Sequence, residues 1–237
     1  MPSNNLLTVS EVLPALESIA GRRFGDFMEP SRLAALRGGG NINKGMVGQV
    51  LEQVLGVGNS TRTLDLADGE LKTHKSTPAG VPMETVAVTM VSTIIDELFD
   101  HRPFSETRVY KKLNRTIFVP AYRDRSAAPE DWMFLRPVFV DLDDPKWSGV
   151  KAILHDDYDR ICRHTQACFN TGDKMLHGTP APKRLLQIRT KDSAPYSPIY
   201  SNRVGRYVSN KNYAFYLTKT FVDLIHLTSG FERGAAR

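Results

Sequence analysis

The chain has 237 residues, of which 41% are hydrophobic and 24% are charged, a composition typical of a globular protein rather than a disordered one. Lys and Arg outnumber Asp and Glu by 31 to 26, which gives a net charge of +5. This mild excess fits a polyanionic partner without requiring one. Because no leader-like start and no stretch of about 20 apolar residues is seen, we expect a cytoplasmic protein with no membrane contact and with Cys162 and Cys168 reduced.

The spacing of apolar residues predicts alternating helices and strands. The first helix is expected over 9–19 with Ser10 as its N-cap, and the glycines at 38–40 indicate a loop. Further helices are expected over 44–55, 92–99, within 147–169 and over 218–227, and strands over 70–74, 84–91, 115–122, 132–141, 185–189 and 214–217. This order predicts an α/β fold with a central sheet.

One segment carries a chemically meaningful set of side chains. Residues 63–75 read TLDLADGELKTHK, in which Glu70 and Lys72 lie two apart on a predicted strand and therefore share a face. Asp65 precedes that strand, and a turn at 68–69 would return it to the side of Glu70. Two carboxylates can hold Mg²⁺, and a lysine can stabilise negative charge at a phosphate, so the set suits phosphodiester cleavage.

The same string also has a less specific interpretation. An Asp, four residues, a Glu and a Lys two further on occur by chance in many proteins as charges on a strand edge. Asp68 competes with Asp65 for the role of the first acid, and the pattern alone leaves this open. Glu52 falls on the preceding predicted helix, from which it could add a carboxylate.

The surroundings of this string resemble the MutH-like endonuclease family, which contains the mismatch-repair endonuclease MutH and related type II restriction enzymes. The helix KGMVGQVLEQVLG (44–56) is followed by ELKT, as in that family. PMETVAV (82–88), KKLNRTIFVP (111–120), LLQIRTK (185–191) and AFYLTKTF (214–221) then resemble family segments in the same order. The collinear order is more specific than any single motif.

The resemblance implies roles for individual residues. Asp65, Glu70 and Lys72 match the catalytic acid, acid and lysine, and Glu52 matches a helix glutamate near the metal, so the implied Mg²⁺ ligands are Asp65, Glu70 and Glu52. Lys112 matches a lysine beside the active site. The implied DNA-binding residues are Lys44, Arg184, Arg189, Lys191 and Tyr216, the last matching a tyrosine that senses adenine methylation.

The resemblance also implies a fold and an activity. The expected fold is a restriction-endonuclease-like α/β core, with a central mixed sheet flanked by helices and two lobes around a DNA cleft. The whole chain (1–237) would be one such domain, with a catalytic lobe over about 1–125 and a DNA-reading lobe over about 126–237. We expect a type II restriction enzyme that needs Mg²⁺ and cuts double-stranded DNA at a short site, with GATC as the first candidate.

Two alternatives remain open at this point. The first is a mismatch-repair nickase that cuts hemimethylated GATC and is activated by a MutL-like partner. The second is a DNA-binding protein on the same fold without catalysis, which the complete Asp65, Glu70 and Lys72 set disfavours. The oligomeric state, the recognition sequence and the cut position do not follow from the sequence.

Several other segments of the sequence have polar or chemically reactive side chains. Residues 196–213 are basic and aromatic and are predicted to form a loop that contacts DNA or lies free on the surface. Cys162, His164 and Cys168 do not have the spacing of a zinc site, so buried helical thiols are the better interpretation. The glycines at 39–45 lack the pattern of a nucleotide-binding loop. His74 is interpreted as a polar neighbour of Lys72 on the same strand face.

Overall fold

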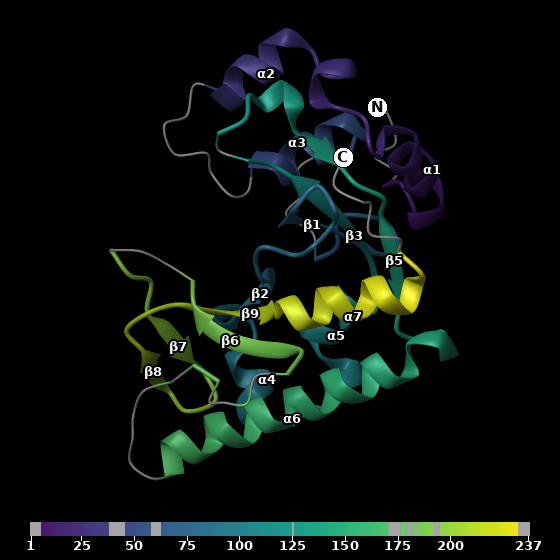
Figure 1. Ribbon diagram of the computed structural model, residues 1–237. Helices are drawn as coiled ribbons and strands as arrows, with labels where there is room; N and C mark the ends of the chain where they lie inside the picture. Colours follow the sequence, from purple (N-terminus) through teal and green to yellow (C-terminus); the bar gives the residue numbers. More distant parts are fainter. Residues whose placement is uncertain are drawn as a thin grey trace, which may run out of the picture. The chain divides into compact units, whose positions relative to one another are not determined.

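The computed structural model describes residues 6–37, 46–57, 63–124, 126–170, 176, 178–179, 182, 184–191 and 195–231. The chain forms two compact units (Figure 1). Unit 1 comprises 1–84, 115–140 and 225–237, and unit 2 comprises 85–114 and 141–224. Both units draw on chain from before and after residue 125, whereas the sequence suggested lobes divided near that position.

Unit 1 is built around a mixed sheet with helices. Strand β1 runs parallel to β3, with Glu70 beside Thr116 and Lys72 beside Phe118, while β4 is antiparallel to β3 and β5 also pairs with β3. The elements of this unit are α1 (Val9–Ile19), η1 (Phe24–Asp26), α2 (Pro30–Arg37), α3 (Met46–Val54), β1 (Glu70–Ser76), β3 (Arg115–Tyr122), η4 (Pro129–Asp131), β4 (Met133–Phe134) and β5 (Val138–Asp141). The α/β class with a mixed sheet is therefore confirmed.

The core of unit 1 joins its helices to one face of β1. Leu71 of β1 packs in the same buried cluster as Leu16 of α1, Leu51 of α3 and Ile117 of β3. Successive residues on β1 alternate between this cluster and the other face of the strand. Burial of Leu71 thus directs Glu70 and Lys72 to the opposite face.

The start of α1 differs from the prediction. The N-cap is Thr8 rather than Ser10, because the Thr8 hydroxyl accepts from the Glu11 N–H and the Glu11 carboxylate accepts from the Thr8 N–H at 2.7 Å. This reciprocal capping box needs a Glu three residues after the cap, which Thr8 has and Ser10 lacks.

Unit 2 contains an antiparallel sheet of order β2–β9–β6 and a separate hairpin of β7 and β8. The long helix α6 contacts β6, and α4 contacts β7. The elements are β2 (Val86–Met90), η2 (Val91–Thr93), α4 (Ile95–Phe99), η3 (Phe104–Glu106), α5 (Arg108–Leu113), η5 (Pro145–Trp147), α6 (Ser148–Asn170), β6 (Leu186–Thr190), β7 (Ile199–Ser201), β8 (Arg206–Ser209), β9 (Tyr213–Leu217) and α7 (Lys219–Ser229), which continues into unit 1 from Ile225.

Three predictions of local structure need correction. The strand expected over 132–141 is two short strands separated at 135–137, where Pro137 has no N–H for a ladder hydrogen bond. The helix expected over 92–99 is a 3₁₀ turn followed by the five-residue α4. Residues 196–213, expected to be a loop, contain the β7–β8 hairpin. The glycine loop at 38–40 lies outside the described residues.

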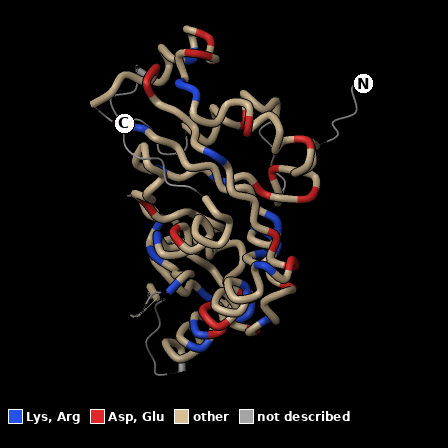
Figure 2. Tube along the Cα trace, turned by 45° about the vertical axis from the view of Figure 1, so that its right-hand side comes forward, with Lys and Arg blue, Asp and Glu red and all other residues tan. Residues whose placement is uncertain are grey.

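Charged residues of both signs are mixed along the chain. Figure 2 shows basic and acidic residues interspersed along the trace rather than separated into single-sign blocks. In the part of the chain that the structure describes, no helix is both long and apolar enough to cross a membrane.

Candidate functional site

A tight turn in unit 1 joins Asp65 to β1. The Leu66 N–H donates to the Gly69 carbonyl at 3.0 Å, which closes the turn. Gly69 cannot be replaced without movement, because a Cβ there would lie 2.6 Å from Val9 Cγ2 and 2.7 Å from the Arg115 carbonyl oxygen. The close approach of α1 and β3 to this turn therefore requires glycine.

This turn brings Asp65 and Glu70 together. The Asp65 N–H donates to Glu70 Oε2 at 3.4 Å, and Asp65 Oδ2 accepts from the Leu71 N–H at 3.2 Å. The Glu70 side chain is fully buried, and Lys72 Nζ lies 2.5 Å from Glu70 Oε1. Two carboxylates and one ammonium group are therefore grouped at the start of β1, in the arrangement that the two-residue period predicted for Glu70 and Lys72.

Asp68 lies in different surroundings. Its Oδ1 accepts from the Val9 N–H at 2.8 Å, at the start of α1, and its Oδ2 forms an ion pair with Arg115 at 3.0 Å. The Arg115 Nε also donates to the Asp68 carbonyl. The structure thus gives Asp68 contacts that join α1 to β3, and gives Asp65 the contacts with the Glu70 segment.

Glu52 on α3 lies within electrostatic range of the same group. Burial raises the pKa of Glu52 above its ordinary value of 4.5, the charges of Asp65 and Glu70 raise it further, and Lys72 lowers it. A raised pKa means that the surroundings disfavour another negative charge. Three carboxylates facing one ammonium group leave an excess of negative charge that a bound cation would neutralise.

These side chains fit Mg²⁺ by their chemistry. Mg²⁺ takes oxygen ligands, often only one or two carboxylates, with water and substrate phosphate completing its shell. Asp65 and Glu70 supply two such carboxylates, from residues joined by the hydrogen bond of the Asp65 N–H to Glu70 Oε2. Among the described residues, no three or more His, Cys, Asp and Glu side chains are arranged as a ready-made metal site.

His74 lies on the same strand face as Glu70 and Lys72 but is buried. Its side chain is 1% exposed, and its ring lies 5.9 Å from the ring of His226 in the same unit. Burial, together with His226, lowers the pKa of His74 from 6.5 to about 3. Neither ring nitrogen has a hydrogen-bond partner within the described part of the chain. His74 is therefore a neutral core residue, which its polarity in the sequence did not indicate.

A cluster of basic residues surrounds Tyr216 in unit 2. The Arg189 guanidinium lies 4.9 Å from the centre of the Tyr216 ring, and Lys191 Nζ lies 5.7 Å from it. Strands β6 and β9 are neighbours, so Arg189 pairs with Ala214 and Gln187 with Tyr216. Arg189 and Lys191 are exposed. The three residues that the resemblance assigned to DNA binding on these strands thus lie together.

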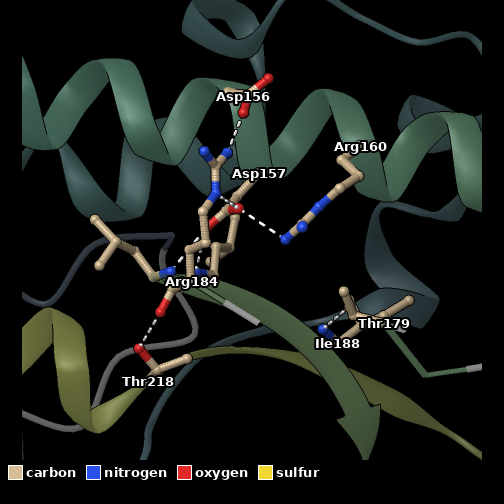
Figure 3. A network of polar contacts seen from close by, with 9 residues as sticks. Asp156, Asp157, Arg160, Thr179, Arg184, Ile188 and Thr218 are labelled. Atoms are coloured by element: carbon tan, nitrogen blue, oxygen red, sulfur yellow. Dashed lines mark hydrogen bonds and ion pairs between the residues drawn. The ribbon is translucent and has the colours of Figure 1, made fainter. Parts of the chain in front are cut away.

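Arg184 is engaged in a polar network between α6 and β6 (Figure 3). Its Nε donates to Asp157 Oδ1 at 3.0 Å, and its guanidinium also pairs with Asp156. The fully buried Asp157 carboxylate accepts in addition from the Leu185 and Leu186 N–H groups at 2.8 and 2.9 Å. The guanidinium of Arg184 therefore joins two elements of unit 2, and its contact with DNA stays a prediction.

Three further predictions from the sequence concern Lys112, Lys44 and the two cysteines. Lys112 lies in the last turn of α5 in unit 2, and its role beside the acidic group stays a prediction. Lys44 lies outside the described residues. Cys162 and Cys168 are buried thiols on α6 that form no disulfide in the described part of the chain, as the interpretation of helical core cysteines expected. Burial raises the pKa of Cys162 to about 12, so this thiol is protonated at neutral pH.

Comparison with known proteins does not add a family to this picture. No protein-family model matches the chain, and no curated protein matches it. The function must therefore be argued from the side chains and their geometry.

Proposed function

We propose that this protein is a magnesium-dependent endonuclease that hydrolyses phosphodiester bonds in duplex DNA. The observation that carries the proposal is the grouping of Asp65, buried Glu70 and Lys72 at the start of β1. The proposal includes a restriction-endonuclease-like core with two lobes around DNA. Within this class we favour a type II restriction enzyme that acts at a short site, with GATC as the first candidate.

Each residue of the group has a role in this proposal. Asp65 and Glu70 would hold Mg²⁺, and Glu52 would add negative charge beside it. The bound ion would polarise the phosphate and lower the pKa of a water molecule. The Lys72 ammonium group would orient the attacking water and stabilise the negative charge that develops on the phosphate oxygens. Its pairing with Glu70 keeps this ammonium group at the acidic residues.

The basic cluster of unit 2 supports DNA as the substrate. Arginine can bind a guanine edge bidentately, and lysine can bind phosphate. Arg189 and Lys191 are exposed, and both of their charged groups lie over the ring of Tyr216. These contacts restrict where the two charged groups can lie. We propose that these three residues contact the DNA, and that Lys112 acts beside the acidic group.

The first experiment is cleavage of supercoiled plasmid with Mg²⁺ by the wild type and by two pairs of matched variants. Asp65→Asn should abolish cutting, whereas Asp68→Asn should retain it, since Asp68 contacts α1 and Arg115 instead of the Glu70 segment. Lys72→Ala should lose at least about a hundredfold in rate, the order of loss for a group that stabilises transition-state charge. Lys75→Ala removes the same charge from the opposite face of β1 and should cut normally.

The products distinguish the alternatives. Linear fragments with uniform ends would support a restriction enzyme, and open circles alone would support a nickase that needs a partner. Equal cutting by the wild type, Asp65→Asn and Lys72→Ala would refute the proposed site. Binding of DNA without any metal-dependent cutting would favour the non-catalytic alternative.

A further inference from the structure

The β7–β8 region of unit 2 exposes three tyrosine side chains. Tyr196, Tyr200 and Tyr207 are 47%, 46% and 61% exposed, whereas Tyr158 and Tyr216 in the same unit are buried. Tyr200 and Tyr207 face each other across the two strands, with ring centroids 5.3 Å apart and ring planes at 79°. Large aromatic surface left in water needs an explanation when it is grouped in this way.

The hairpin is anchored firmly from its other face. Ile199 and Val208 are fully buried. Asp96 of α4 accepts from the Ser201 hydroxyl at 2.5 Å and from the Arg203 N–H at 3.2 Å. The hairpin is therefore held by buried apolar contacts and by bonds to α4, so the exposed rings form a preorganised surface.

The chain segment that carries the rings contains basic but no acidic residues, while Asp96 and Asp100 of the α4 region contact Ser201 and Arg203 of the hairpin. No Asp or Glu occurs between 193 and 222, while Arg206 and Lys211 lie in that segment. Lys211 Nζ lies 4.8 Å from the centre of the Tyr196 ring, and the Arg206 guanidinium lies 5.4 Å from the centre of the Phe169 ring. Cations interleaved with exposed aromatic rings match a phosphate backbone that carries bases on one side.

We propose that the aromatic surface formed by Tyr196, Tyr200 and Tyr207, with Arg206 and Lys211, binds unpaired bases of single-stranded DNA by stacking. In a duplex the faces of the bases are covered by their neighbours, so exposed rings gain most from bases that have left the stack. Stacking of this kind is tolerant of sequence. This inference goes beyond cleavage of duplex DNA, because it assigns unit 2 a second nucleic-acid site, and only the choice of DNA over RNA rests on the proposed function.

The test must separate binding from folding, because a cross-strand aromatic pair also stabilises a hairpin. The double variant Tyr200→Phe/Tyr207→Phe keeps both rings and removes the hydroxyl groups. The double variant Tyr200→Thr/Tyr207→Thr removes the rings and keeps residues that favour strands. The single variant Tyr207→Thr removes only the most exposed ring and disturbs the hairpin least.

Fluorescence anisotropy with a labelled oligo-dT of about 15 nucleotides, the span of a typical single-strand site, measures the affinity. EDTA is present so that no cutting occurs. The wild type and the Phe variant should bind alike, Tyr207→Thr should bind about fivefold or more weakly, and the Thr double variant about tenfold or more weakly. Binding of a blunt duplex should change less than twofold in all variants.

Two results would overturn this inference. One is a wild type that does not bind the single strand, and the other is a Tyr207→Thr variant that binds it as tightly as the wild type. A plasmid-cutting assay on the same preparations tests the nuclease proposal independently of single-strand binding. Cutting without single-strand binding refutes only the stacking surface, and single-strand binding without cutting refutes only the nuclease.

Discussion

At the scale of single residues, Glu52 and His74 both have pKa values moved by burial, in opposite directions. For Glu52 the neighbouring acids add to the effect of burial, which raises its pKa. For His74 burial and His226 keep the ring neutral. Each shift predicts how the stability of the protein depends on pH or on a bound cation, because a pKa shift on folding is a contribution to stability.

Glu52→Gln should raise the melting temperature of the metal-free protein at neutral pH. A carboxylate with a raised pKa destabilises the folded state increasingly as the pH rises above 4.5 and fully once the pH exceeds the raised pKa, and glutamine removes this charge. The difference from the wild type should vanish below pH 4.5, where Glu52 is protonated in the folded and the unfolded chain. Mg²⁺ should raise the melting temperature less in the variant, and differential scanning fluorimetry measures both effects.

The control for this substitution is Glu17→Gln, which changes an exposed glutamate of α1. It should leave both the melting temperature and the response to Mg²⁺ close to those of the wild type. A Glu52→Gln variant that melts at a lower temperature than the wild type without metal would contradict the electrostatic account.

His74→Phe should flatten the pH dependence of stability. The folded pKa of about 3 lies below the ordinary 6.5, so the contribution of His74 is complete above pH 6.5 and is lost as the pH falls towards 3. One such group changes the unfolding free energy by up to about 1.4 kcal/mol per pH unit. Urea titrations at pH 7.5, 5.5 and 4.5 measure this slope. Parallel curves for the variant and the wild type would refute the assignment, and the exposed His155→Phe serves as the control.

At the scale of elements, the joint between α6 and β6 depends on one buried carboxylate. Strand β6 is an edge of its sheet, and an edge strand leaves backbone N–H groups without a ladder partner. Asp157 accepts from one such group at Leu186 and from the N–H of Leu185 just before the strand, and Thr179 Oγ1 accepts from another at Ile188 (Figure 3). Side chains thus complete the hydrogen bonding of this strand.

Asp157→Ala should destabilise the protein by about 3–5 kcal/mol, the cost of breaking a buried, hydrogen-bonded ion pair. Asp156→Ala removes the neighbouring carboxylate, which is exposed and pairs with the same arginine, and should cost far less because water screens an exposed ion pair. Chemical denaturation of the two variants measures the contrast. Equal losses would show that Asp157 is not the centre of this network.

Elements differed in how well the sequence predicted them. The strand over 115–122 and the helix over 9–19 agree with β3 and α1, because long stretches of regular apolar spacing specify both. The β7–β8 hairpin was missed, because Pro195, Pro198 and the polar residues 201–203 are typical of loops. Its strands are also short, and burial of Ile199 and Val208 against the rest of unit 2 is not visible in a local pattern.

At the scale of the whole molecule, each unit is assembled from separated segments of chain. The acidic group belongs to unit 1, and the basic cluster around Tyr216 belongs to unit 2. The net charge of +5 is small, so the strength of DNA binding should depend on where the basic residues lie rather than on their total number.

The affinity of Asp65→Asn for duplex DNA, measured without Mg²⁺, should fall as the salt concentration rises. A plot of log affinity against log salt concentration should be linear. Each phosphate contact contributes about 0.9 to the slope, so Lys191→Ala should reduce the slope by about one. Lys151→Ala is the control, because Lys151 pairs with Asp143 at 2.7 Å. Identical slopes for Asp65→Asn with and without the Lys191→Ala change would exclude Lys191 from the DNA contact.

The sequence by itself determined that Glu70 and Lys72 share a strand face, because the period of a strand is two residues and Leu71 between them is apolar. It also determined the α/β class. Only the tertiary structure decided that Asp65 accompanies Glu70 while Asp68 binds Arg115 and the start of α1. That choice depends on α1 and β3 packing against Gly69, which are contacts between residues far apart in the chain that a local pattern does not contain.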